Sequence, residues 1–177
     1  MRQTIEQSIV INSSAADVWS QIIDLYITTF RHPAFFRLLD IPKPLKAELS
    51  HAGLGGERTA YFAGGKMFKQ EIVLWQPPDA IESVGSFSRF NFTFRASPDF
   101  RVGYLLNLHS GPFQMKAGAY RIEPVEGRVR LYLSSEYELI GFFGACLLAP
   151  VRCILFLFQL YLLRGIERNA ESEFADA

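Results

Sequence analysis

The chain lacks an excess of charge of either sign and has very few cysteines. Its 177 residues include 18 Lys and Arg against 18 Asp and Glu. No basic stripe stands out, so a nucleic-acid partner is not expected. Cys146 and Cys153 lie about 10 Å apart along one predicted helix, too far for a disulfide between them. We expect two buried, inert thiols in a reducing compartment.

Targeting and catalytic signatures are also missing. Met1-Arg2-Gln3-Thr4 opens directly into a strand-like pattern without an apolar leader, so the sequence favours a cytoplasmic location, with membrane association left open. There is no G-x-S-x-G, H-E-x-x-H, P-loop or C-x-x-C pattern. His32, His51 and His109 lie far apart, in or beside predicted loops, so neither a metal site nor a cofactor is expected.

What the chain does have is a near-continuous apolar run from Leu139 to Leu163, followed by charged residues to Arg168. It predicts a long C-terminal helix over 139–168, and the apolar run alone would measure roughly 37 Å. That length could span a bilayer. Pro150 and Arg152 argue against spanning, because the first removes a helical hydrogen bond and the second places a charge near the centre.

A helical wheel divides this run into two sides. Gly141, Ala145, Arg152 and Gln159 fall on one narrow stripe, which predicts a solvent-facing edge on a helix otherwise enclosed by protein. A kink at Pro150 could instead rotate the following residues and direct Arg152 into the interior, where its guanidinium could hold a carboxylate. Because the apolar arc is wider than one sheet covers, a homodimer or membrane contact remains open beside a monomer.

In the rest of the chain, the spacing of apolar residues changes between the two-residue period of a strand and the 3.6-residue period of a helix. Strands are predicted at 5–11, 45–49, 57–63, 66–75, 80–86, 115–123 and 128–138, and helical segments at 15–24 and within 25–39. Gly64-Gly65 and the 124–127 segment are expected to close hairpins. This order predicts a single α+β domain over 1–177, with a curved antiparallel sheet around the C-terminal helix and two short helices after the first strand.

One aromatic stretch, 87–113, is longer than a simple connection. Phe90, Phe92 and Phe94 alternate with polar residues. The stretch is interpreted as an insertion: a lid over a cavity, a surface touching a membrane, or an ordinary extension of the sheet.

Five segments carry a family resemblance: Ile9–Trp19, the glycine-rich 53–58 and 64–66 segments, the 71–78 strand end and Gly118–Pro124. Together they resemble the strands and first helix of the START-like (SRPBCC) superfamily with the helix-grip fold, in particular its polyketide cyclase/dehydrase-like and lipid-transport branches. The resemblance covers most of the chain and implies a deep apolar cavity between sheet and C-terminal helix.

The first functional hypothesis is binding or transport of a hydrophobic or amphipathic small molecule, lipid-like or polyketide-like. Its expected lining residues are Tyr61, Phe68, Ile72, Tyr120, Leu131, Leu133, Phe143, Leu147, Ile154 and Phe158. One alternative is a cyclase or dehydratase that uses an inward acid or base, for which Glu71, Glu136 and Glu138 are weak candidates and the catalytic residues are unknown. A second alternative is a membrane-associated or oligomeric interaction protein.

Overall fold

A computed structural model describes residues 2–23, 32–78, 100–110, 113–141 and 144–175. The strands are β1 (Arg2–Ile11), β2 (Pro44–Leu49), β3 (Glu57–Phe62), β4 (Met67–Gln76), β5 (Phe100–Ser110), β6 (Phe113–Val125) and β7 (Arg128–Leu139). The helices are α1 (Ala15–Ile23), α2 (Ala34–Leu38), the 3-10 turn η1 (Ala63–Gly65) and α3 (Gly144–Ala175).

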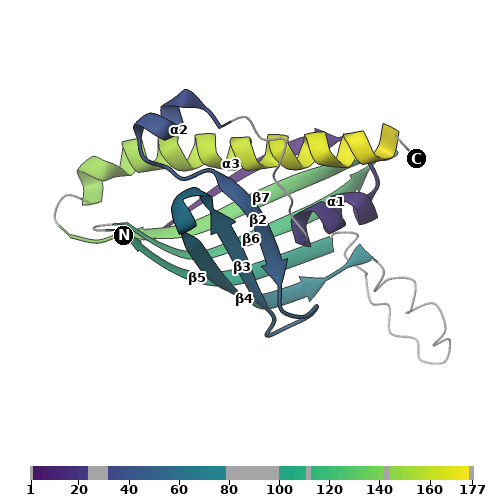
Figure 1. The fold of residues 1–177 in the computed structure, drawn as a ribbon, viewed down its shortest axis with the longest axis horizontal. Helices are drawn as coiled ribbons and strands as arrows, with labels where there is room; N and C mark the ends of the chain where they lie inside the picture. Colours follow the sequence, from purple (N-terminus) through teal and green to yellow (C-terminus); the bar gives the residue numbers. More distant parts are fainter. Residues whose placement is uncertain (1, 24–31, 79–99, 111–112, 142–143, 176–177) are drawn as a thin grey trace.

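All seven strands form one antiparallel sheet in the order β1-β7-β6-β5-β4-β3-β2. The sheet curves beneath α3, which runs along its concave side, while α1 and α2 lie near opposite ends of α3 (Figure 1). The predicted α+β class, with a curved sheet around a long C-terminal helix and two short helices after the first strand, is confirmed.

Local sequence explains the turns that shape the sheet. Gly64 and Gly65 both take positive φ values, 79° and 73°, within the 3-10 turn Ala63–Gly65. Three residues therefore close this hairpin, rather than the two that the sequence predicts. Glu126 and Gly127 also take positive φ values between β6 and β7, at 45° and 78°. At the start of α1, the Ser14 hydroxyl accepts the Asp17 backbone N–H at 3.1 Å, which is an N-cap contact.

Two apolar clusters join the sheet to α3. The larger cluster includes Ile11, Ile122, Leu131, Leu163 and Ile166, all fully buried. The smaller cluster consists of Ile5, Tyr137, Leu139 and Leu155, with partly buried neighbours from the first turns of α3. In β7, Val129, Leu131, Leu133 and Tyr137 face inward, as their period-two phase predicts.

The ends of several predicted elements need correction. The helix begins at Gly144 rather than Leu139, because Leu139 pairs with Phe113 as the last residue of β7, and it continues to Ala175. The part of the aromatic stretch from Phe100 to Ser110 is β5. The predicted strand at 80–86, the Phe90–Phe94 alternation and the 24–31 part of the second helical segment lie outside the described residues.

The predicted solvent-facing stripe on the C-terminal helix is wrong for one of its members. Arg152 is exposed, but Gln159 is only 2% exposed and lies against the sheet. Both cysteines are exposed, contrary to the expectation of buried thiols. These differences share one cause: the sheet covers a narrower part of the helix than the apolar run suggests, and it covers the side that carries Gln159.

Candidate functional site

A cavity of about 550 Å³ lies between α3 and the concave face of the sheet. Its walls combine residues from both apolar clusters, such as Leu155 from the smaller one and Tyr104 and Leu133 from the larger one. The α2–β2 segment and the turn between β3 and β4 complete it. The volume falls within the range of small-molecule sites in proteins.

Most of the predicted lining residues that the structure describes do line the cavity: Tyr61, Phe68, Tyr120, Leu133, Ile154 and Phe158. Ile72 and Leu131 do not. Ile72 lies two residues after Gln70 in β4, and Leu131 lies two residues before Leu133 in β7. At both positions the larger apolar cluster fills the space. Leu147 packs against the smaller cluster instead, and Phe143 lies outside the described residues.

The sheet side of the cavity contains a buried cation that sequence reasoning missed. Arg58 of β3 is 5% exposed, and its guanidinium donates to the Gln70 side-chain oxygen at 2.6 Å and to the Ile22 carbonyl at 3.1 Å. The guanidinium also lies 5.9 Å from the centre of the Tyr104 ring. Within the described part of the chain, its Nε–H has no hydrogen-bond partner.

Two buried tyrosines stand beside Arg58. The Tyr104 and Tyr120 rings are 6.2 Å apart and their hydroxyls are hydrogen-bonded. Burial raises the pKa of both hydroxyls above the usual value, so both stay protonated at neutral pH. Gly118 makes this arrangement possible, because a Cβ there would lie only 2.6 Å from an edge atom of the Tyr104 ring.

The helix side of the cavity contributes one polar residue, Gln159. Its amide nitrogen donates to the Ser135 hydroxyl at 2.9 Å and to the Ile5 carbonyl at 3.2 Å. Its side-chain oxygen is buried and has no partner among the residues that the structure describes. Gln159 therefore fixes α3 to β1 and β7 and leaves an acceptor at the cavity wall.

The cavity rim is formed by residues 39–44 and by the turn around Phe62 to Lys66. Two contacts join these segments: the Ala63 N–H donates to the Lys43 carbonyl at 2.8 Å, and Lys66 lies 3.7 Å from the Asp40 carboxylate. Asp40 and Lys66 are exposed, so the cavity reaches solvent here. Tyr61, expected to hold a hydroxyl inside the cavity, instead bonds to Glu48 at this edge, which raises the pKa of Tyr61.

The acidic residues considered from the sequence lie away from the cavity. Glu71 is exposed, Glu136 pairs with Arg2, and Glu138 lies 3.5 Å from Lys116. Arg152 is exposed on α3 and does not reach the cavity wall. None of these residues can act as an acid, base or anchor inside the cavity as it stands.

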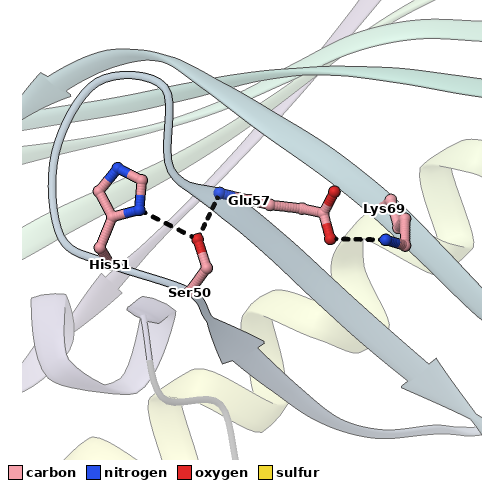
Figure 2. Close-up of polar contacts among 4 residues, drawn as sticks. All are labelled: Ser50, His51, Glu57 and Lys69. Atoms are coloured by element: carbon pink, nitrogen blue, oxygen red, sulfur yellow. Dashed lines mark hydrogen bonds and ion pairs between the residues drawn. The ribbon is translucent and has the colours of Figure 1, made fainter.

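The described histidines have other surroundings. Figure 2 shows His51 in the loop between β2 and β3, its Nδ1 3.2 Å from the Ser50 hydroxyl, which also accepts the Glu57 N–H at 3.0 Å. Glu57 also accepts a hydrogen bond from Lys69 at 2.8 Å (Figure 2). His32 packs against Phe36 and Tyr161. Across the described residues, no group of three metal-binding side chains comes together.

One sequence signal could have revealed the polar wall. Arg58 alternates with Ala60 in β3, and Gln70 alternates with Ile72 in β4, so each polar residue occupies an inward position of its strand. Arg58 pairs with Gln70 across the β3–β4 hairpin. The predicted two-residue turn would have paired Arg58 with Glu71, so this register depends on the three-residue connection Ala63–Gly65 that the structure shows. An inward Arg opposite an inward Gln is the pattern to search for.

Neither a family model nor a curated protein matches this chain. Solved structures with similar folds include Ara h 8.0201, with 13% identity, a TM-score of 0.58, and coverage of 97% of this chain and 99% of that one. Norcoclaurine synthase from Thalictrum flavum matches with 14% identity, a TM-score of 0.52, and coverage of 95% and 92%.

The di-domain ARO/CYC BexL, from the BE-7585A biosynthetic pathway, also matches, with 13% identity and a TM-score of 0.55. The match covers 96% of this chain and 50% of BexL. These are structures of Bet v 1-like and START-like type, so the resemblance inferred from the sequence is confirmed for the fold. At such low identity the likeness extends to the fold alone.

Proposed function

We propose that this protein binds an apolar or amphipathic small molecule in the cavity between α3 and the sheet, as a carrier or a sensor. The observation that carries this proposal is the cavity itself, a space of about 550 Å³ open at one rim. A folded chain gains packing energy by filling such a space, so a large apolar void that persists between two well-packed clusters supports a ligand-binding role.

The chemistry of the walls supports binding more than catalysis. Apolar side chains make up most of the lining, and burial of a ligand against them would contribute about 25 cal/mol per Å² before association costs. The polar groups at Arg58, Tyr104 and Tyr120 are hydrogen-bond donors, and burial raises the pKa of both tyrosine hydroxyls, which keeps them protonated. Among the lining residues that the structure describes, the only carboxylate is Asp40, which is exposed at the rim and poorly placed for a general base.

Native mass spectrometry of the purified protein tests this function. We expect a bound mass that is released on denaturation, or saturable uptake of added dodecanoate by ligand-free protein. Ala60→Phe, which fills the cavity from β3, should abolish binding. Val73→Phe places the same side chain at an exposed position of β4 outside the cavity and should leave binding intact. A folded wild type that binds neither native ligand nor dodecanoate would contradict the proposal.

A second candidate function concerns the outer face of α3. Phe156 and Leu157 are 42% and 36% exposed, and Leu38 of the neighbouring α2 is 83% exposed. Figure 1 shows α2 lying against the side of α3 that faces away from the sheet. Cys146–Ser172 is long and apolar enough to cross a membrane, yet only 17% of its most apolar window is buried. Large exposed apolar faces of this kind favour an interaction partner.

We propose that this outer face rests on an anionic membrane surface. Between Gly144 and Ile166, α3 carries no carboxylate. Arg164 borders the outer face, where it pairs with Glu167 at 2.8 Å, and α2 adds the exposed Arg37. Basic residues beside exposed apolar ones suit an anionic bilayer. A symmetric dimer through the same face would bring the arginines of two copies together. Spanning is disfavoured because Gln159, Leu163 and Ile166 on the opposite face are enclosed by the sheet.

Vesicle flotation tests the membrane proposal. We expect binding to vesicles that contain phosphatidylserine, weaker binding to neutral vesicles, and release by salt. The double variant Phe156→Ser and Leu157→Ser should lose binding, while Val73→Ser, exposed on the sheet, should keep it. The proposal would be overturned if the protein did not bind the vesicles. It would also be overturned if analytical ultracentrifugation showed a wild-type dimer and a monomeric double variant.

A further inference from the structure

The polar corner of the cavity is defined by Arg58, Gln70, Tyr104 and Tyr120. Its unusual feature is a buried positive charge that contacts no carboxylate among the residues that the structure describes. The groups that the Arg58 guanidinium contacts are neutral: an amide oxygen, a backbone carbonyl and a tyrosine ring. Among the described lining residues, the sole carboxylate belongs to Asp40 at the rim.

Position along the strand places this charge well inside the protein. Arg58 precedes the rim residue Phe62 by four residues of β3, which corresponds to about 13 Å of extended chain. The guanidinium also donates to the carbonyl of Ile22, in the last turn of α1, so α1 lies behind it. A molecule entering at the rim would therefore meet apolar walls first and Arg58 at the inner end.

The corner also holds more hydrogen-bond donors than acceptors. Arg58 has a buried Nε–H that no described residue satisfies. Tyr104 and Tyr120 have two hydroxyl protons and use one of them in the bond between their hydroxyls, which leaves the other for an acceptor in the cavity. A buried cation with unused donors is costly unless an anion or acceptor completes it.

We propose that the cavity binds an amphipathic carboxylic acid, with its carboxylate at Arg58 and Tyr120 and its apolar body extending toward the rim. This inference rests on the proposed ligand-binding function and specifies the class of ligand. A carboxylate would supply the missing negative charge, accept the unused Nε–H of Arg58, and accept a tyrosine hydroxyl proton at the same time. Charge-assisted bonds of this kind are about twice as strong as neutral ones.

The alternative role of Arg58 is purely structural, because it links β3 to β4 through Gln70 and to the end of α1 through Ile22. A structural role predicts that losing the charge destabilises the fold but leaves ligand preference unchanged. The test must therefore measure preference between two ligands within one variant, since that ratio does not depend on the fraction of folded protein.

The experiment compares binding of dodecanoate and its methyl ester, both at submicellar concentration, by native mass spectrometry and calorimetry. In the wild type we expect at least about tenfold tighter binding of the acid. Arg58→Gln, which keeps a donor for Ile22, should bring the ratio near one, and Arg58→Lys should keep part of the preference. Lys66→Gln, which removes the same charge from the exposed rim, should leave the ratio unchanged.

The outcomes separate the two proposals. If the wild type binds acid and ester equally, the carboxylate site is wrong and the ligand-binding function stands. If acid preference survives Arg58→Gln, or falls in Lys66→Gln instead, the charge at Arg58 does not hold the carboxylate and the assignment is overturned. If neither compound binds to folded wild type, the proposed function itself fails.

Discussion

The two faces of α3 have similar apolar composition, but one face is buried and the other is exposed. Leu155, Gln159, Leu163 and Ile166 lie against the sheet and are buried, although one of them is polar. Phe156 and Leu157 lie on the outer face and are exposed. Burial along this helix therefore follows the position of the sheet and not the hydropathy of each residue. The inner face packs into the fold, and Phe156 and Leu157 on the outer face stay exposed.

The contrast is sharpest between two polar residues one heptad apart. Arg152 and Gln159 fall on nearly the same side of an ideal helix, yet Arg152 is exposed and Gln159 is 2% exposed. Gln159 is tolerated inside because its amide nitrogen reaches both Ser135 and Ile5. The hydrogen-bond partners, supplied by β1 and β7, create the difference.

The largest expected effect is a difference in the free energy of unfolding between a substitution on the inner face of α3 and one on its outer face. Leu163→Ala on the inner face should lower the free energy of unfolding by about 2–5 kcal/mol, because the side chain is fully buried in the larger apolar cluster. Leu157→Ala, the matched change on the outer face, should cost far less, within about 1 kcal/mol. Urea unfolding measures both. Equal losses would mean that the outer face is also packed in solution.

A smaller effect should distinguish the two polar residues. Gln159→Ala removes two hydrogen bonds and leaves the Ser135 and Ile5 groups without that partner, so we expect a loss of about 1–3 kcal/mol. Arg152→Ala should change stability by no more than about 0.5 kcal/mol. The same unfolding experiment compares them. A neutral Gln159→Ala would show that the link between α3 and the sheet adds no stability.

The smallest effect concerns the buried tyrosines. The pKa of Tyr104 and of Tyr120 is raised in the folded protein. Above pH 10 an unfolded tyrosine releases its proton while the folded one keeps it, so the folded state binds more protons and stability falls as pH rises. Each tyrosine should contribute up to about 1.4 kcal/mol per pH unit above pH 10. Urea midpoints at pH 9 to 11 measure this slope.

Tyr104→Phe provides the control for the alkaline effect. Removing one hydroxyl should make the free energy of unfolding fall less steeply above pH 10. Below pH 9 the pH dependence of that free energy should stay nearly the same. An identical slope in wild type and variant would show that groups elsewhere in the chain cause the alkaline loss.

Much of the fold could be predicted because its signals are local. The Gly64-Gly65 turn, the period-two phase of β7 and the cap at Ser14 each depend on neighbouring residues. The cavity was predicted less completely. Leu133 and Ile72 face the same side of the sheet by pattern, but only Leu133 lines the cavity, because the larger apolar cluster fills the space at Ile72. Strand phase gives the face of the sheet and not the position of a void.

The sequence by itself determined the α+β class, the order of the strands and helices other than β5, and the presence of one long apolar helix, because these follow from periodicity and turn chemistry within short windows. The tertiary structure decided which side of that helix is buried, which residues surround the cavity, and that Arg58 lies inside it next to Gln70 and two tyrosines. Those properties depend on contacts between segments tens of residues apart, and the energy of a buried charge or amide is set by the partners that the fold brings to it.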